Sequence, residues 1–398
     1  MQRRLVHLRS AEDSRTLSRR LARPVEDDNF RGFAAMAPLP SEATLHLLRS
    51  SLARAPVRVV AGARGVALVG DLFSLFAAGR ELKEREERVA AELGEWIEHA
   101  AAAIDGPPAP LPLGGRRLDW TRPVVMGIVN VTPDSFSDGG RFLTPDAAIA
   151  HGLELAAEGA DILDVGGEST RPRGQTYGAG ASEVPADEEI ARVVPVLRGL
   201  EARTDVPLSV DTRKSIVAQA ALDAGATMVN DITGLLHDPA LAQVVSTAGV
   251  PLCLMHTPAD VESLAHEAPS EDVLGEVLNG LTRSIDAATA AGVERARLIV
   301  DPGIGFGKTV AGNLLLLHHL EAIAALGLPV LVGASRKSSI ARAGSGTGEA
   351  LPLGERLFAS VGAAVAAYLG GAHLLRVHDV RATIEALRVA QAIRTALD

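Results

Sequence analysis

Short apolar runs alternate with segments of helical spacing from about residue 124 to the end of the chain. Each run has the length and composition of a buried strand, and each following segment repeats its apolar positions every three or four residues. The runs are VVMGIVNV, DILDVGGE, PLSVDT, TMVNDI, PLCLMH, LIVDPG, PVLVGAS and HLLRVHD. Eight strand–helix units of similar length predict a (β/α)8 barrel and favour this closed form over a doubly wound open sheet.

The first hundred or so residues follow a different pattern. VRVVAGARGVALVG at 57–70 predicts two short strands around a glycine turn, and 81–104 has the spacing of a charged amphipathic helix. DGPPAPLPLGG at 105–115 contains four prolines and cannot continue that helix. We therefore predict a small N-terminal α+β extension over 1–104, a linker over 105–115 and a barrel over 116–398. The extension carries no chemical motif and is predicted to be an accessory or oligomerisation domain.

Composition narrows the range of partners. A net charge of −10 and only 3% aromatic residues argue against nucleic acid and anionic membranes, although local cations can still bind a small anion. The single cysteine, Cys253, excludes an internal disulfide and fits a reducing cytoplasm. No apolar run approaches the roughly 18 residues of a membrane span, and the basic N-terminal segment lacks the apolar core of a secretory signal. We expect a cytoplasmic protein.

Polar side chains end nearly every predicted strand. The set comprises Asn130, Glu168, Asp211, Asn230, Asp231, His256, Asp301, Ser335, Arg376 and His378. One such residue can simply cap the next helix. The carboxyl ends of all barrel strands open onto one face, where barrel active sites lie, so the whole set predicts a shared polar pocket.

The predicted pocket combines two kinds of chemistry. Asp211, Asn230 and Asp301 offer acceptors, and the asparagine also donates, which suits a heterocycle with several N–H groups such as a pterin or guanine. Arg336, Lys337, Arg376 and His378 offer positive charge for an anion. The residues therefore predict a ligand with a hydrogen-bonding heterocycle at one end and an anion at the other.

Two further motifs do not carry the chemistry that they suggest. GIGFGKT at 303–309 lacks the P-loop register, because Pro302 stands where the first glycine belongs. The adjacent histidines of LHH at 317–319 cannot share one helix face, so surface positions are expected there rather than a metal site.

Eight motifs, in their order along the chain, resemble the dihydropteroate synthase family. They are MGIVNVTPDSFSDGG, DVGGESTRP, SVDT, VNDI, LMH, DPGIGFGK, ASRKS and RVHDV, and the likeness runs from about Leu113 to the C-terminus. The resemblance implies a (β/α)8 barrel that joins (7,8-dihydropterin-6-yl)methyl diphosphate to 4-aminobenzoate in folate biosynthesis. It further implies release of diphosphate and 7,8-dihydropteroate, a requirement for magnesium (Mg²⁺), sulfonamide sensitivity, and a homodimer built on barrel helices.

The resemblance also implies a role for each matched residue. The pterin-binding set is Asp211, Asn230, Met255, Asp301 and Lys337. The diphosphate-binding set is Asn130, Arg376 and His378, with Asn130 also a ligand of Mg²⁺. The aminobenzoate-binding set is Phe136, Thr170, Arg171, Pro172, Phe306 and Ser338. Asp138 lies on the same first loop as Phe136, and the residues implied in catalysis are Asp138, Asp211, Lys337, Arg376 and His378.

Two alternatives and one departure remain. A pterin-dependent methyltransferase would share the barrel but has no diphosphate to bind, so ESTRP, SRKS and RVHD together argue against it. A catalytically inactive binding barrel would be expected to lose Asn130, Lys337, Arg376 or His378, and all are present. The second loop departs from the family, because Arg173 replaces a glycine after STRP and the segment to Ser182 is longer.

Overall fold

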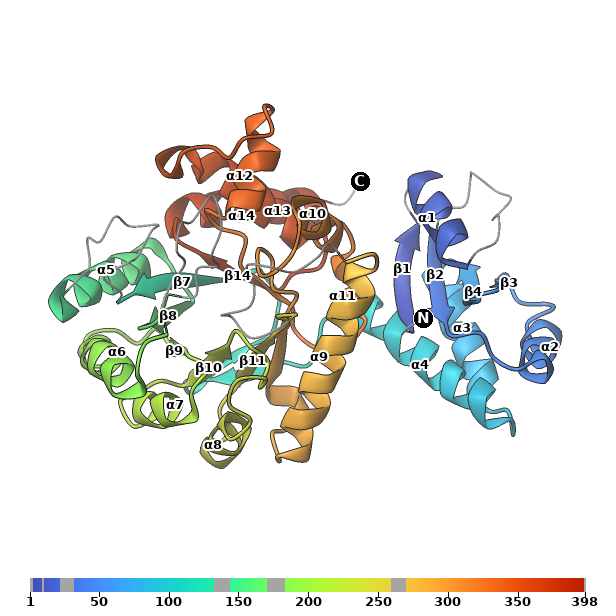
Figure 1. Cartoon of the computed structure of the whole chain (residues 1–398), viewed down its shortest axis with the longest axis horizontal. Coiled ribbons are helices and arrows are strands. Elements are labelled where there is room, and N and C mark those ends of the chain that lie inside the picture. The colour runs from blue at the N-terminus through green and yellow to red at the C-terminus, as the bar shows by residue number, and fades with distance from the viewer. Residues whose placement is uncertain are drawn as a thin grey trace. The chain divides into compact units, whose positions relative to one another are not determined.

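The computed structural model describes residues 3–8, 11–21, 32–131, 144–169, 183–258 and 270–396. The chain forms two compact units (Figure 1). One contains Met1–Pro108 together with His319–Leu328, and the other contains Ala109–His318 together with Pro329–Asp398. Among the described residues, no helix is both long and apolar enough to cross a membrane.

The larger unit is a closed parallel barrel. Its strands, in chain order, are β7 (Val124–Asn130), β8 (Ile162–Gly166), β9 (Leu208–Asp211), β10 (Met228–Asp231), β11 (Leu252–Met255), β12 (Leu298–Asp301), β13 (Leu331–Val332) and β14 (Leu374–Val377). Successive strands pair from β7 to β12, and β14 pairs with both β7 and β13. A parallel bridge between Val300 and Val330 joins the two ends of the sheet. The predicted (β/α)8 barrel is confirmed.

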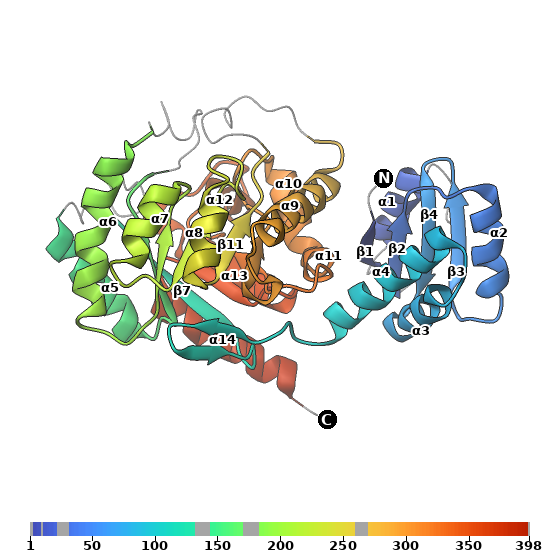
Figure 2. The same ribbon diagram turned by 90° about the horizontal axis from the view of Figure 1, so that it is seen from below.

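Helices surround the strands in Figures 1 and 2. They are α5 (Pro145–Glu158), α6 (Ala186–Glu201), α7 (Ser215–Leu222), α8 (Leu241–Ala248), α9 (Val273–Ala290), α10 (Val310–His318), α12 (Ser338–Ser345), α13 (Leu357–Leu369) and α14 (Val380–Thr395). The start of α5 shows how local sequence sets these limits. Thr144 accepts a hydrogen bond from the Ala147 amide, and proline occupies the first helical position. Gly159 then ends the helix with φ +103°, a conformation that glycine adopts readily.

Apolar side chains fill the amino-terminal end of the barrel. Met126, Cys253 and Ile299 share one buried cluster with Leu111 and Leu113 of the hairpin β5 (Leu111–Leu113) and β6 (Arg116–Leu118). Burial raises the pKa of the Cys253 thiol well above its ordinary value, so this side chain packs as a small hydrophobe. Apolar packing at this end leaves the carboxyl ends of the strands for polar chemistry.

The smaller unit is the α+β region expected at the N-terminus. Its antiparallel sheet has the order β1 (Arg4–Leu8), β2 (Gly32–Ala37), β4 (Gly65–Gly70), β3 (Arg58–Gly62). The helices are α1 (Ala11–Leu21), α2 (Glu42–Ser51), α3 (Leu72–Lys83), α4 (Arg88–Asp105) and α11 (Leu320–Ala324). The predicted strands within 57–70 are confirmed. The predicted helix over 81–104 is interrupted, because α3 ends at Lys83 and Glu87 caps a new helix by accepting the Ala90 amide.

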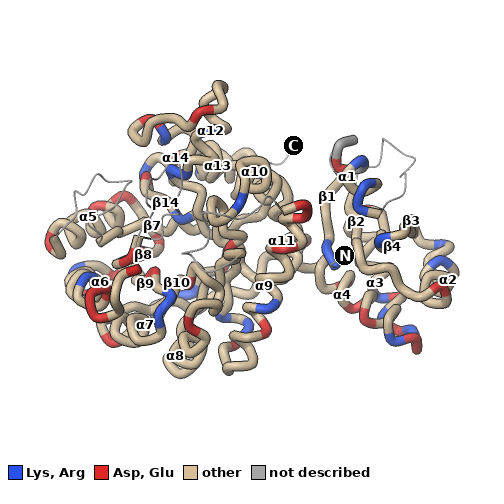
Figure 3. The backbone as a smooth tube through the Cα atoms, viewed as in Figure 1, with Lys and Arg blue, Asp and Glu red and all other residues tan. Residues whose placement is uncertain are grey.

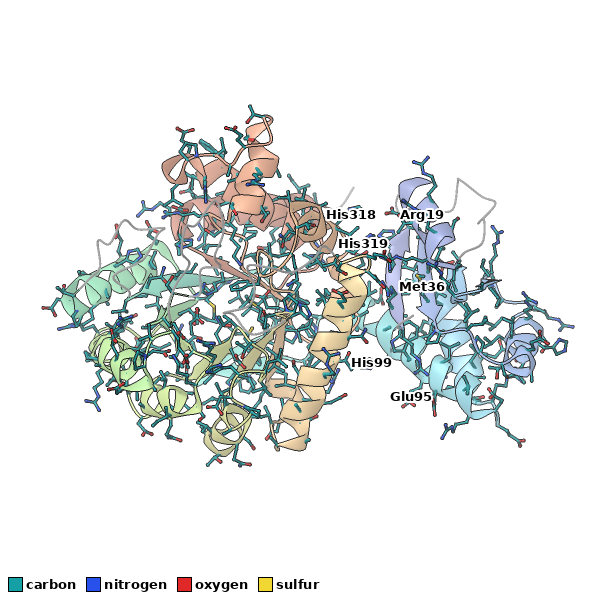
Figure 4. The ribbon with its side chains drawn as sticks, in the orientation of Figure 1. Arg19, Met36, Glu95, His99, His318 and His319 are labelled. Carbon is teal, nitrogen blue, oxygen red and sulfur yellow. The ribbon has the colours of Figure 1, made fainter. Side chains whose placement is uncertain are left out.

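Residues 319–328 complete this smaller unit although they follow β12 in the chain. Glu321 Oε1 accepts the His7 amide at 3.2 Å and lies 3.3 Å from His319 Nδ1. Ala325 joins the same apolar core as Leu68 and Ile97. His319, labelled in Figure 4, is only 5% exposed, so the expectation of a surface position is wrong for this residue. The error arose because α10 ends at His318, so the two histidines do not share one continuous helix.

Removal of residues 1–108 should therefore expose part of α11 and the turn that follows it. A chain starting near Leu111 is expected to unfold at a lower temperature than the full chain. Ala325→Asp provides the matched test, since it buries a charge only when the smaller unit is present. We expect it to lower the thermal midpoint of the full chain by at least about 4 °C and to leave the shortened chain unchanged. Equal shifts in both chains would contradict this packing.

Candidate active site

Neighbouring strands bring several predicted site residues to one level of the barrel. Parallel pairing sets Asn130 of β7 beside Gly166 of β8, and Gly166 beside Asp211 of β9. It also sets Asp211 beside Asn230 of β10. These side chains stand at the carboxyl ends of their strands because each strand stops where its apolar run stops. The register thus assembles residues from separate motifs.

Arg376 joins carboxyl groups from two other strands, and a third strand joins this network through Asp164. Its Nε donates to Asp164 Oδ2 at 2.6 Å and its Nη2 donates to Asp211 Oδ2 at 2.7 Å. Asn230 Nδ2 donates to the same Asp164 oxygen at 3.1 Å. Asp164 is fully buried and was not among the predicted site residues, because it lies inside an apolar run rather than at its end. It is the polar residue within ILDVG, which is the signal that could have found it.

The charges of this network depend on each other. Burial raises the pKa of the Asp211 carboxyl, Arg376 opposes that rise, and the nearby Asp164 adds to it. Burial alone would lower the pKa of Arg376, but Asp164 and Asp211 outweigh it and hold the pKa above its ordinary value. Arg376 is therefore a permanent cation between two carboxylates, in a setting where an anion or a hydrogen-bonding ring can compete for its donors.

Lys337 lies against the loop that follows β12. Its ammonium donates to the Ile304 carbonyl and stands 4.5 Å from the centroid of the Phe306 ring. Asp301 ends β12, and its carboxylate accepts the Gly303 amide at 2.7 Å. Burial lowers the pKa of Lys337 to about 8 and raises that of Asp301, while the attraction between the two groups opposes both shifts. Lys337 therefore contacts the Phe306 ring and interacts electrostatically with Asp301.

The remaining predicted residues are placed as follows. Met255 ends β11 beside Asp301 and is 3% exposed, whereas Asn130 and Ser338 are half-buried. Ser338 is the first residue of α12. Phe136, Asp138, Thr170, Arg171, Pro172 and the long segment Arg173 to Ser182 lie outside the described residues. Their roles stay predictions.

His378 and Arg336 differ from the cations that the sequence predicted. Ser335 Oγ lies 3.0 Å from His378 Nδ1, and burial, with Arg336 and Arg376 nearby, lowers the pKa of His378 well below its ordinary value. The imidazole is therefore neutral near pH 7 and can meet an anion only through an N–H group. Arg336 donates through two nitrogens to Asp379, at 3.1 and 2.7 Å. Its charge is thus already engaged by a carboxylate.

Asp231, the neighbour of Asn230, has a local role. Its carboxylate accepts hydrogen bonds from the Thr233 amide, the Thr233 hydroxyl and the Leu235 amide. Successive strand residues point to opposite faces. Asn230 therefore faces the Arg376 network, whereas Asp231 shapes the loop after β10.

A second buried charge cluster lies beside β8 and β9, where Figure 3 shows acidic and basic positions together. Lys214 Nζ donates to Glu168 at 2.9 Å, to Glu189 at 2.6 Å and to the Val184 carbonyl at 2.8 Å. Arg213 donates twice to Glu168 at 3.2 Å, and Glu168 accepts the Val184 amide at 3.0 Å. Glu168 and Val184 flank the undescribed segment 170–182, so the cluster links both ends of that segment. Sequence reasoning missed Arg213 and Lys214 because nothing in SVDTRK marks them as buried.

The sequence and structure match known proteins over the barrel. The model of the pterin binding enzyme family matches residues 126–378. The dihydropteroate synthase of Mycobacterium leprae is 46% identical over 268 residues, which is 67% of this chain and 91% of the relative. The chain therefore belongs to the pterin-binding barrel enzymes.

Two solved structures narrow the assignment. Xanthomonas albilineans dihydropteroate synthase with 4-aminobenzoic acid is 49% identical, with a TM-score of 0.65 over 73% of this chain and all of that one. Yersinia pestis dihydropteroate synthase in a sulfonamide drug complex is 41% identical, with a TM-score of 0.67 over 72% of this chain and all of that one. The chain is a member of the dihydropteroate synthase family, a family of transferases, and the resemblance seen in its motifs is confirmed.

Proposed function

We propose that this chain joins (7,8-dihydropterin-6-yl)methyl diphosphate to 4-aminobenzoate, giving 7,8-dihydropteroate and diphosphate in folate biosynthesis. The observation that carries the proposal is the Arg376 network, in which the guanidinium bonds to Asp164 and Asp211, and Asn230 bonds to Asp164, at the carboxyl ends of neighbouring strands. This arrangement suits a ring edge and an attached anion together. The 4-aminobenzoic acid and sulfonamide named for the solved relatives agree with the second substrate.

The pterin would lie among the buried groups of the barrel. Asp211, Asn230 and Asp301 would meet its amino and ring N–H groups, since carboxylates and amide oxygens accept such donors. Lys337 would donate to its ring acceptors, and Met255 would pack against the ring face. Burial of these groups supports the assignment, because hydrogen bonds to buried polar groups discriminate strongly against ligands that lack the matching donors.

The diphosphate would lie near Arg376, His378 and Asn130. Arg376 would supply charge and paired N–H donors, and the neutral His378 would supply an N–H. The amide oxygen of Asn130 is the type of hard ligand that Mg²⁺ takes, and its half-buried place at the end of β7 fits an ion that keeps several waters. Bound Mg²⁺ would add positive charge where the leaving group gains negative charge.

Bond breaking at the pterin methylene would then be the main step. The methylene–oxygen bond breaks with its electron pair leaving on diphosphate, the aminobenzoate nitrogen forms the new bond to the methylene carbon, and that nitrogen passes a proton to the released diphosphate or to water. Arg376 would stabilise the leaving diphosphate, while Asp211 and Asp301 would stabilise positive charge on the pterin. No covalent enzyme intermediate is needed. Cys253, the one cysteine, is packed in the apolar cluster at the far end of the strands.

The aminobenzoate would lie at the mouth of this pocket. Phe306 and Ser338 are the described members of its predicted site, and both belong to elements that contact Lys337 or follow it directly. Phe136, Asp138, Thr170, Arg171 and Pro172 are proposed to complete the site. Holding the amine in line with the methylene carbon would be the chief task of these groups.

The lowered pKa of Lys337 predicts that the reaction becomes slower at high pH. A lysine is charged below its pKa, so Lys337 loses its charge as the pH rises through about 8 rather than near 10.5. We expect kcat/KM for the dihydropterin diphosphate to fall above about pH 8. Lys337→Arg should remove this fall, whatever its overall rate, because guanidinium stays charged. A wild-type profile that stays flat to about pH 10 would contradict the assignment.

The family resemblance also implies an oligomeric state and a cellular location. We propose a homodimer, and exposed apolar side chains on α13 and α14 support it, with Phe358 85%, Val389 61% and Ile393 70% exposed. Phe358→Asp is expected to convert the dimer to a monomer in light scattering, while Phe73→Asp on α3 should not. A wild-type monomer at micromolar concentration would contradict the proposal.

We further propose a cytoplasmic enzyme without nucleic-acid or membrane partners.

The decisive test measures both products with the purified full chain. Diphosphate and dihydropteroate should appear in equal amounts, and only when 4-aminobenzoate and Mg²⁺ are both present. A sulfonamide should compete with 4-aminobenzoate. Methyl transfer from a methylated folate would instead indicate the methyltransferase alternative, and pterin binding with no product of either kind would indicate an inactive barrel.

A further inference from the structure

The loop between β12 and α10 has a backbone that glycine makes possible. Gly303, Gly305 and Gly307 have φ values of +69°, +85° and +57°. Other residues rarely adopt this region, so GIGFGK encodes a specific loop shape even though it is not a P-loop. The lysine of this motif, Lys308, has no role in the reaction described above.

Lys308 forms hydrogen bonds with backbone carbonyls of its own loop. Its ammonium donates to the carbonyls of Gly303 at 2.9 Å, Phe306 at 3.0 Å and His256 at 3.3 Å. An ammonium has three protons, and here three carbonyl oxygens surround it. His256 follows β11, so this one side chain connects the loops that follow two neighbouring strands.

The other side of the loop is held by α10. The Gly305 amide donates to Asn313 Oδ1 at 2.6 Å, and Asn313 Nδ2 donates to the carbonyls of Lys308 and Thr309. Asn313 is fully buried. Space between the loops is also tight, because a Cβ at Gly303 would lie 2.0 Å from the His256 carbonyl oxygen. The loop therefore has little freedom while these contacts last.

The same loop holds Lys337. The Ile304 carbonyl accepts from its ammonium, the Phe306 ring lies 4.5 Å away, and a Cβ at Gly305 would come within 2.8 Å of Lys337 Cδ. The contacts of Lys337 with Ile304 and Phe306 thus depend on a backbone that Lys308 organises.

We propose that Lys308 is a positioning residue of this enzyme, which holds residues 302–309 in the shape that places Ile304 and Phe306 against Lys337. It acts through these groups and touches no substrate. The proposal rests on the proposed function for its kinetic consequence, but the loop contacts themselves do not depend on that function.

The charge of Lys308 agrees with this placement. Burial lowers the pKa of His256 to about 3, and Lys308 is the next contributor to that shift. Burial raises the pKa of Asp301, which Lys308 helps to oppose together with Lys337 and the Gly303 amide. A neutral side chain at position 308 would lose both the N–H donors of Lys308 and the effect of its charge on His256 and Asp301.

Kinetics of five variants test the proposal. Lys308→Met should lower kcat/KM for 4-aminobenzoate about 100-fold, a loss that displacement of a positioned group by about 1 Å can cause. Lys308→Arg keeps charge and donors and should recover to within about tenfold of wild type. Lys83→Met, at a lysine whose side chain is 51% exposed in the smaller unit, should change nothing. Phe306→Ala combined with Lys308→Met should lose less activity than the two single losses multiplied together, because contacting residues that act together are not additive.

Each outcome decides the proposal. Additive losses in the double variant, or wild-type kinetics in Lys308→Met, would overturn it. Failure of Lys308→Arg to recover activity would also overturn it when the variant keeps a wild-type thermal midpoint. If wild type itself forms no dihydropteroate, the proposed function fails, and amide hydrogen exchange then tests the loop separately. Lys308→Met should speed exchange at Gly305 at least tenfold, and unchanged exchange would refute the positioning role.

Discussion

Arg376→Met is expected to lower kcat/KM for the dihydropterin diphosphate by about 10²–10³-fold. The leaving diphosphate would lose the cation proposed for it, and removal of one such group typically costs about 10²–10³-fold. The substitution should also lower the free energy of unfolding by about 3–5 kcal/mol, because the remaining buried carboxyl groups are left without their cation. Here the two remaining charges are Asp164 and Asp211. Steady-state kinetics would measure the loss, and calorimetry would compare binding of the diphosphate ester with binding of the bare pterin. We expect the ester to lose more.

Two companion variants separate the roles of Arg376. Arg376→Lys keeps the charge but cannot bridge both carboxylates with fixed geometry, so its activity should be intermediate. Arg376→Met combined with Asp164→Asn removes one uncompensated carboxylate and should recover part of the lost stability. Binding of the ester should not recover, since the cation proposed for the diphosphate is still missing. Equal losses for the ester and the bare pterin would remove diphosphate binding from the role of Arg376.

Lys214→Met is expected to have the largest effect on stability. The substitution leaves the fully buried Glu189 without its cation, and it removes one of the two cations of Glu168, whose side chain is 6% exposed and which keeps Arg213. We expect a loss of about 3–5 kcal/mol in the free energy of unfolding, measured by urea denaturation. Lys83→Met is the matched control, because the exposed pair of Lys83 with Glu98 should contribute at most about 1 kcal/mol.

A second substitution tests the cause of that loss. Glu189→Gln added to Lys214→Met removes one buried charge and should regain at least about 1 kcal/mol. If Lys214→Met costs less than about 1 kcal/mol, the cluster is not a buried charge network. The cluster also joins Glu168 to Val184 across the segment 170–182, so we expect the KM for 4-aminobenzoate to rise in Lys214→Met as well.

Many of the candidate site residues could be found in the sequence, because the strands of a barrel lie side by side in the order in which they occur in the chain. Each βα unit pairs with the next, so residues that end successive apolar runs meet on one face. Asn130, Asp211 and Asn230 illustrate this, since the ladder aligns them in the order in which their motifs occur.

Residues that depend on distant partners could not be predicted in this way. Asp164 looked like part of an apolar run, and its pairing with Arg376 spans 212 positions of sequence. Lys308 looked like the end of a failed P-loop, and its contact with the His256 carbonyl requires β11 and β12 to lie side by side. Local patterns carry no information about which buried charges will meet.

By itself, the sequence determined the (β/α)8 barrel, the α+β character of the extension, the family, and strand-end residues such as Asn130. Hydrophobic periodicity and the residues that end each strand are local properties, so both can be read directly from the sequence. Only the tertiary structure decided that residues 319–328 pack with the smaller unit, that His378 is neutral, and that Arg376, Lys214 and Lys308 each join several buried groups. These properties depend on burial and on distances across the fold, which exist only once the chain has folded.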